Sequence, residues 1–289
     1  GLTPSTTYYF YVSTDCGNGD SSAWSSAGTF KTACAAMAVP MTETFDNAST
    51  TRDCWTRGFL ANGDWGTTTP AAGTYNPATN TTNHSGGYSM RLYGYYSATG
   101  PRSTMAWVAS PEYLTPLNQL QVTFWARTNN AAGILHVGVL ADPNDGGSFE
   151  SLADLTFTAA NSWVQFTIPL NTLTLANAKH IAFMADGADA SAAIYYFVDD
   201  VVVDLAPDCP TALQVKASRV TNQTAQISWL GGAQSWNIKV STTALTDPAT
   251  DAADVLTTNI TGSPYALTGL TALTTYHVYL QAVCNAAGD

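Results

Sequence analysis

Two adjacent carboxylates interrupt an otherwise apolar run about two-thirds of the way along the sequence. Asp199 and Asp200 lie within FVDDVVV. Successive side chains of a strand point to opposite faces, so one acid points inward and the other outward. A carboxylate in an apolar strand is costly unless something neutralises it. Hydrogen bonds to an aspartate at the end of a strand are one way to offset this cost.

Aromatic side chains form a second group able to bind a ligand. They gather in the segment 55–107, as Trp55, Trp65, Tyr75, Tyr88, Tyr93, Tyr95, Tyr96 and Trp107, and YGYYS at 93–97 interrupts the strand pattern. Sugar rings stack on exposed aromatic rings, so the segment suggests a carbohydrate-binding face with Trp65, Tyr95 and Tyr96 as candidate ligand-binding residues. The alternative is that half are core and the rest cover loops, because large aromatics often bury only part of their surface.

Catalytic chemistry is not indicated, and we expect that the chain is not an enzyme. The histidines have no HExxH spacing, no GxSxG elbow accompanies them, and the acids show no isolated pair suited to acid–base work. His136, in ILHVGVL, is predicted to be a strand-face histidine without a catalytic role. DPNDGG at 142–147 lacks the Glu at position twelve of an EF-hand, so it predicts a turn.

Charge and composition limit the partners. The formal net charge is −11, with ten Lys and Arg residues in 289. Nucleic acid and polybasic membrane binding both require clustered positive charge, so neither is expected. No apolar stretch approaches the length of a membrane span, and no signal peptide is recognisable, so we expect no direct membrane insertion by this segment.

The elements that must position these groups are strands. Short alternating runs bounded by Gly, Pro, Asn and Asp recur throughout, whereas helical periodicity is almost absent, which predicts an all-β chain. In LQVTFWAR, at 120–127, Val122, Phe124 and Ala126 share one face, and Trp125 joins Arg127 on the other.

The two ends of the chain repeat one element. Placing Gly269 on Gly1, a shift of 268 residues, superposes Tyr276 on Tyr8 and Cys284 on Cys16. Such self-similarity is typical of tandem arrays, so the ends are expected to be cuts through successive repeats. The five cysteines lack CxxC spacing, which favours disulfides in an oxidising compartment over a zinc site.

Residues 207–289 resemble a fibronectin type III domain without its last strand, through TAQISWLGG, SWNIKVS and YALTGLTALTTYHVYLQAVC. Trp229 matches the family's core Trp, and Tyr276 its corner Tyr, whose hydroxyl bonds the backbone. The resemblance implies that Cys209 pairs with Cys284. Residues 1–34 resemble the last two strands of another such domain, which leaves Cys16 as the odd cysteine. The remaining disulfide would join Cys34 to Cys54.

Residues 35–206 resemble the cleaved-adhesin, MAM-like jelly-roll domains of bacterial adhesins, including those attached to gingipain-type proteases. The resemblance rests on TETFDN, CWTRG, SGGYSMRL, VASPEYL, LQVTFWAR, VGVLADPNDGGSFESL, WVQFTIPL, IAFMA and YYFVDDVVV, although the loop 61–83 departs from the common pattern. It implies a structural Ca²⁺ ion that joins the first strand to the last. The implied ligands are Glu43 or Asp46 with Asp199 or Asp200, besides backbone carbonyls.

The expected architecture is therefore a jelly-roll β-sandwich flanked by partial type III sandwiches. The expected function is a structural and adhesive repeat unit of a long extracellular bacterial surface protein or filament, with neighbouring repeats, glycans or other cell surfaces as partners. A carbohydrate-binding module of a secreted multidomain protein is one alternative. A subunit of a self-assembling extracellular fibre is another.

Overall fold

The structure is a computed structural model that describes residues 1–61, 64–67, 78–96, 103–171, 173–174, 176–185 and 194–284. The prediction of an all-β chain with sandwich-like sheets is confirmed. Within the described ranges, helical structure is limited to 3-10 turns at Arg52–Cys54, Leu117–Gln119 and Gly146–Ser148. The same ranges contain no helical segment that could span a lipid bilayer.

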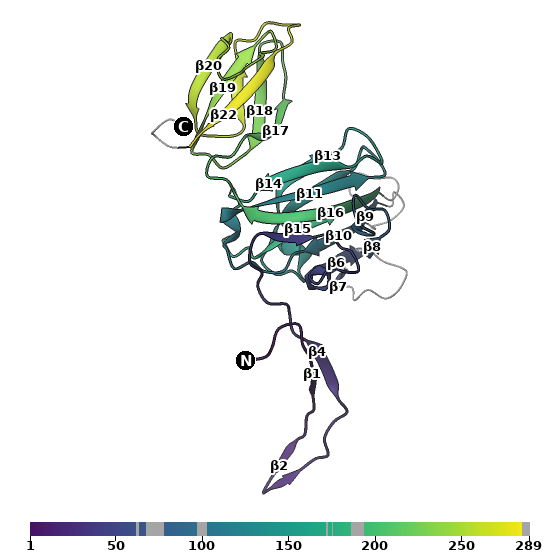
Figure 1. Cartoon of the computed structure of the whole chain (residues 1–289). Helices are drawn as coiled ribbons and strands as arrows, with labels where there is room; N and C mark the ends of the chain where they lie inside the picture. Colours follow the sequence, from purple (N-terminus) through teal and green to yellow (C-terminus); the bar gives the residue numbers. More distant parts are fainter. Residues whose placement is uncertain are drawn as a thin grey trace.

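The centre of the molecule is a twelve-stranded sheet folded into two layers (Figure 1). Its strands pair along the path β13-β12-β15-β10-β9-β16-β11-β14, with β5 on β16, β6 on β10 and β7, and β8 on β9. They are β5 (Met41–Glu43), β6 (Thr56–Ala61), β7 (Asp64–Thr67), β8 (Ala78–Asn80), β9 (Ser89–Tyr96), β10 (Ser103–Ala109), β11 (Leu120–Thr128), β12 (Ile134–Leu140), β13 (Glu150–Thr156), β14 (Val164–Pro169), β15 (His180–Ala185) and β16 (Ile194–Leu205).

Strand β11 alternates strictly between buried and half-buried side chains, which confirms the two faces expected for LQVTFWAR. Phe124, on its inner face, packs edge-on against Phe183 of β15 with ring centroids 4.7 Å apart. The two rings come from opposite layers, so apolar burial between the layers holds the sandwich together.

The C-terminal part contains two further sheets with their own core. One has the order β17-β18-β21, from β17 (Leu213–Ser218), β18 (Thr224–Leu230) and β21 (Tyr265–Thr268); the other has β20-β19-β22, from β20 (Val255–Ile260), β19 (Ser235–Ser241) and β22 (His277–Val283). Trp229 and Trp236 meet edge to face inside this core, with centroids 5.8 Å apart. The Tyr276 hydroxyl accepts the Thr271 N–H at 2.9 Å, which is the corner contact implied by the sequence resemblance.

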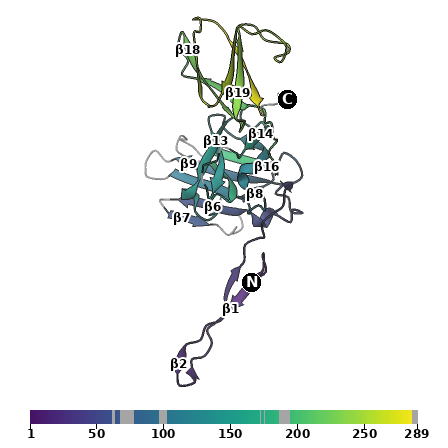
Figure 2. The ribbon, with the colours of Figure 1, turned by 90° about the vertical axis from the view of Figure 1, so that its left-hand side faces the viewer.

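The N-terminal segment is a long two-stranded hairpin that extends away from the central sandwich in both views (Figures 1 and 2). Strand β1 (Thr7–Phe10) pairs with β4 (Gly28–Lys31), and the short strands β2 (Asp15–Gly17) and β3 (Asp20–Ser21) form its tip. The Tyr8 hydroxyl accepts the Thr3 N–H at 2.7 Å. The repeat seen in the sequence is therefore also a repeat of one local contact, five residues apart in each copy.

Both expected disulfides are present. Cys34 is bonded to Cys54 and Cys209 to Cys284, while Cys16 is free and exposed in the hairpin. The first bond ties the segment after the hairpin to the 3-10 turn ahead of β6. The second joins the segment before β17 to the residue after β22 and so links the two C-terminal sheets.

Candidate functional site

The acid pair of β16 is divided between core and surface. Asp199 is fully buried, and its carboxylate accepts the N–H groups of Asp200 at 2.8 Å, His84 at 2.8 Å and Ser85 at 3.3 Å. Burial raises the pKa of Asp199 to about 6, although the three donors favour its charged form. Asp200, at the surface, accepts the Ser85 hydroxyl at 2.7 Å and lies 2.7 Å from His84 Nδ1.

The acids near the first strand of the sandwich are also engaged. Glu43 is fully buried and accepts the Phe45 N–H at 2.5 Å and the hydroxyls of Ser49 and Thr51 at 2.9 and 2.6 Å. Asp46 Oδ1 accepts two N–H groups of the loop 84–88, from Gly87 at 2.7 Å and Tyr88 at 2.9 Å.

The loop 84–88 is consequently held at one end by Asp199 and Asp200 and at the other by Asp46. Carboxylates are ligands that calcium accepts, so the chemistry of the donor set fits the ion. However, the described residues contain no group of three or more His, Cys, Asp or Glu side chains placed to hold a metal. The four acids are thus not gathered at one point, and their hydrogen bonds match the alternative of satisfied strand-end acids.

An aromatic cluster lies on the outer face of the same layer. His84 stacks on Trp125 of β11 with ring centroids 3.9 Å apart and planes 12° from parallel. Trp163, just before β14, meets His84 edge-on at 5.7 Å. Because Asp200 holds the other side of the imidazole, the position of His84 on Trp125 is fixed by a stack and a polar contact together.

Two arginines extend this outer face. The guanidinium of Arg127, on β11, lies 5.8 Å from the centre of the Phe197 ring, and that of Arg91, on β9, lies 5.6 Å from the Tyr195 ring. Strand register places Phe197 opposite Arg127 on one side and Arg91 on the other. The aromatic–arginine face, as we call this surface, is made of Arg91, Trp125, Arg127, Trp163, Tyr195 and Phe197.

The candidate ligand-binding residues from the sequence have a mixed outcome. The side chains of Trp65, Tyr95 and Tyr96 lie outside the described part of the structure. Trp55 and Trp107, from the same aromatic segment, are core residues at 3% and 0% exposure, as the alternative interpretation expected. Trp163, Tyr195 and Phe197 were missed, although the alternation in LQVTFWAR already placed Trp125 beside Arg127 on the outer side.

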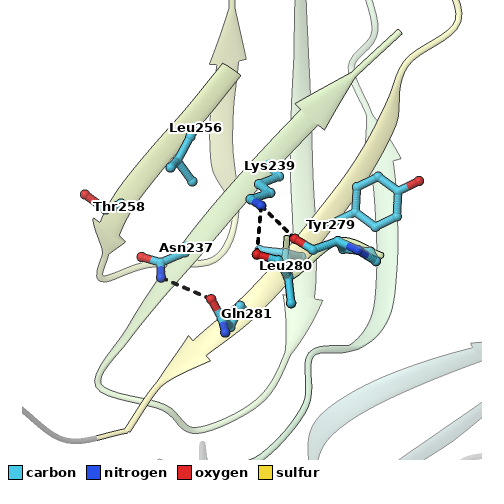
Figure 3. Close-up of a pocket in the computed structure, with 9 residues that line it drawn as sticks. Asn237, Lys239, Leu256, Thr258, Tyr279, Leu280 and Gln281 are labelled. Atoms are coloured by element: carbon cyan, nitrogen blue, oxygen red, sulfur yellow. Dashed lines mark hydrogen bonds between the residues drawn. The ribbon is translucent and has the colours of Figure 1, made fainter. Parts of the chain in front are cut away.

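A groove of about 390 Å³ lies on the C-terminal sheet β20-β19-β22 (Figure 3). Its polar lining is largely occupied by the chain itself. Lys239 Nζ donates to the carbonyls of Pro248 and Asp251 at 2.7 and 2.9 Å, and Asn237 Nδ2 donates to Gln281 Oε1 at 3.4 Å. The groove therefore offers fewer uncommitted donors than its composition suggests.

Two further features singled out in the sequence, His136 and the segment 142–147, are hydrogen-bonded within the protein. His136 faces Asp154 across the β12–β13 pair, with His136 Nδ1 2.7 Å from the carboxylate, and the Ser151 hydroxyl donates to the same oxygen at 2.9 Å. In the 142–147 segment the Asp145 N–H donates to the Asp142 carbonyl at 3.1 Å, so the predicted turn is confirmed.

The chain is similar to several solved structures at low identity. No family profile and no curated protein matches it. The K3 cleaved adhesin domain of Lys-gingipain from Porphyromonas gingivalis W83 aligns with 57% of this chain and 96% of its own, at 23% identity and a TM-score of 0.39. The K1 domain of the same protein aligns over 58% and 99%, at 18% identity and a TM-score of 0.38. A structure described as CBM4 aligns over 56% and 100%, at 17% identity and a TM-score of 0.33. These alignments are distant, so no function is carried over from them.

Proposed function

We propose that this chain is a structural and adhesive unit of a long extracellular array on a bacterial surface, in which type III-like sandwiches alternate with MAM-like jelly rolls. The observation that carries the proposal is the repeated element at the two ends. Tyr8 and Tyr276 make the same hydroxyl contact to the residue five positions earlier, and Cys16 matches Cys284. A chain that repeats its strands at a fixed spacing can extend by stacking neighbours.

The surface of the hairpin supports packing against a neighbouring repeat. Phe10, Val12 and Trp24 are 49%, 60% and 70% exposed, although side chains of this kind usually bury most of their area. Two strands alone are marginal in water, so a second sandwich that covers these residues would stabilise the hairpin. Because β4 pairs with β1, and the end of β1 corresponds to the start of β22, an equivalent of β4 fits beside β22.

Extending the chain tests this arrangement. We would append a second copy of residues 21–33 to the C-terminus and compare it with an extension of the same residues in scrambled order. The native extension should raise the Tm of the C-terminal sheets and protect the amides of β22 from hydrogen exchange. Equal behaviour of the two extensions would contradict the proposal.

The alternative of a fibre built from short subunits gives a different result on a denaturing gel. Subunits would run near the 30.5 kDa of this sequence, whereas one continuous array would run at several times that mass. The measurement requires material purified from its native source.

A second candidate function is carbohydrate binding. It is supported by the cluster of Trp125, His84 and Trp163, in which two half-buried tryptophans and an exposed histidine gather on an outer sheet face. Amphipathic rings of this kind stack on the apolar faces of sugars. Screening the chain and its Trp163→Ala variant on a glycan array tests this function. If the chain binds sugars, the variant should bind them more weakly. If the chain serves only as a spacer between neighbouring repeats, neither protein should bind.

We also propose that a structural calcium ion joins the first and last strands near the loop 84–88. The proposal is supported by the carboxylates of Asp46, Asp199 and Asp200, which all hold this one loop. An ion bound only by the folded state raises its stability by mass action. Chelation should therefore lower the Tm of the central sandwich, and an unchanged Tm would favour the purely hydrogen-bonded arrangement.

A further inference from the structure

We propose that the aromatic–arginine face binds an acidic polysaccharide, a chain of sugar rings in which uronic acid carboxylates recur. This inference rests on the carbohydrate-binding candidate function above and specifies its ligand class. It follows from three features of the face: two arginines that form no ion pair in the described part of the chain, the spacing of these arginines, and the rings beside them.

The positive charge stands out against the chain as a whole. The protein carries a formal charge of −11, yet Arg91 and Arg127 face the same residue, Phe197, from the two strands beside β16. In the described part of the chain neither guanidinium forms an ion pair with a carboxylate, whereas Arg52 pairs with Asp53. The two guanidinium groups are therefore a pair of positive charges without carboxylate partners in an acidic molecule, and they are complementary to an anionic ligand.

The guanidinium groups are also preorganised. Arg91 and Arg127 each lie over an aromatic ring, and Arg127 Nη2 donates to Asn161 Oδ1 at 2.8 Å. In the same described surroundings the Nε atoms of both arginines are buried without a hydrogen-bond partner. A carboxylate on the outer edge of each group would supply the missing counter-charge, and a planar guanidinium suits a carboxylate better than an ammonium does.

The spacing of the arginines favours a polymer over a single sugar acid. Their strands, β9 and β11, flank β16, so the two positions are separated by two strand spacings, about 9.6 Å. A ligand that engages both arginines from these positions carries more than one acid group, as a polymer of sugar acids does.

The rings next to the arginines favour a ligand made of sugars. Trp125 is two residues from Arg127 on β11, about 7 Å along the strand, and it carries His84 and Trp163 beside it. Asp199 is opposite Trp125 in the strand register, and both Asp199 and Asp200 are hydrogen-bonded to the loop 84–88. Because His84 covers one face of Trp125, a chain crossing the face can place carboxylates at the arginines and a sugar ring against His84 and Trp163.

Single-stranded nucleic acid also combines charge with stacking, but its affinity comes from many neutralised phosphates. Two arginines on a chain of −11 supply too little positive charge for that mode. Nucleic acid is therefore an outcome of the test and not the proposal.

The experiment compares polygalacturonate with its fully methyl-esterified form, which has the same backbone without charge, using isothermal titration calorimetry on the full chain. We expect the charged polymer to bind at least about tenfold more tightly, with an affinity that falls as salt increases. The double variant Arg91→Gln, Arg127→Gln should lose that tenfold preference. The matched control, Lys31→Gln with Arg219→Gln, removes the same charge from exposed positions outside the face and should keep it.

The outcomes separate this inference from the function on which it rests. Equal binding of both polymers, unaffected by the arginine substitutions, would overturn the inference and leave carbohydrate binding standing. If no glycan binds, both are overturned. Binding of single-stranded DNA in place of the polyuronate also overturns the inference. Should the double variant fail to fold, the pair Arg91→Lys, Arg127→Lys decides: the proposal expects several-fold weaker binding, and unchanged affinity contradicts it.

Discussion

The two copies of the repeated element have the same local geometry and opposite surroundings. In the C-terminal copy, Val278 and Leu280 pack against the core around Trp229 and Trp236. Their counterparts in the hairpin, Phe10 and Val12, are exposed. Nevertheless the corner tyrosine makes the same backbone contact in both copies.

This difference distinguishes contacts that depend only on the local sequence from burial that depends on a neighbouring sheet. The tyrosine contact spans five residues and needs only the local chain, so it forms in both places. Burial of alternate side chains requires a facing sheet, which the C-terminal copy has in β17-β18-β21. Equivalent substitutions in the two copies should therefore have unequal effects on stability.

The largest contrast is expected for the cysteines. Removing the bond between Cys209 and Cys284, which are 75 residues apart, with Cys284→Ser should destabilise the C-terminal sheets by about 2–5 kcal/mol, because the unfolded chain regains freedom. Cys16→Ser, at the matching position of the hairpin, should change nothing because Cys16 is free. Urea unfolding followed by tryptophan fluorescence measures the stability of both variants. Equal losses of stability in the two variants would contradict the difference expected between the two copies.

A smaller contrast is expected for the apolar positions. Leu280→Ala removes side-chain atoms that pack on the C-terminal core and should cost about 2 kcal/mol, at the low end of such core truncations because Leu280 is only partly buried. Val12→Ala, its counterpart, should cost less than about 0.5 kcal/mol in the isolated chain. In the chain extended by residues 21–33, Leu280→Ala should cost more than in the unextended chain, since the added strand covers the edge of β22.

The sequence was sufficient for the features that depend on local pattern. Strict alternation predicted the two faces of β11, and the type III resemblance predicted the Tyr276 contact and the Cys209–Cys284 bond, which left Cys34 and Cys54 as the remaining pair. The faces of β11 depend on a period and the Tyr276 contact on residues at a fixed separation, and both can be read from the sequence alone.

The candidate site was less predictable because it is assembled across strands. Trp125, His84 and Trp163 are far apart in the sequence and meet only through the β11–β14 pairing and the loop 84–88. The acids show the same limit. Their identity suggested an ion, whereas the N–H groups of His84, Gly87 and Tyr88 that bind Asp199 and Asp46 could not be assigned without the loop conformation.

The corner tyrosines give the smallest contrast and the sharpest test of which part of the comparison is local. Tyr276→Phe removes one hydrogen bond to the Thr271 N–H, which is worth about 0.5–1.5 kcal/mol to the C-terminal sheets. Tyr8→Phe removes the equivalent bond from an exposed hairpin and should leave global unfolding unchanged. Hydrogen exchange at the two amides distinguishes the cases: Thr271 should lose protection in Tyr276→Phe, and Thr3 should lose its weaker protection in Tyr8→Phe. If Thr3 is as well protected as Thr271 in the unmodified chain, the hairpin is already stabilised by a neighbour, and the contrast between the copies disappears.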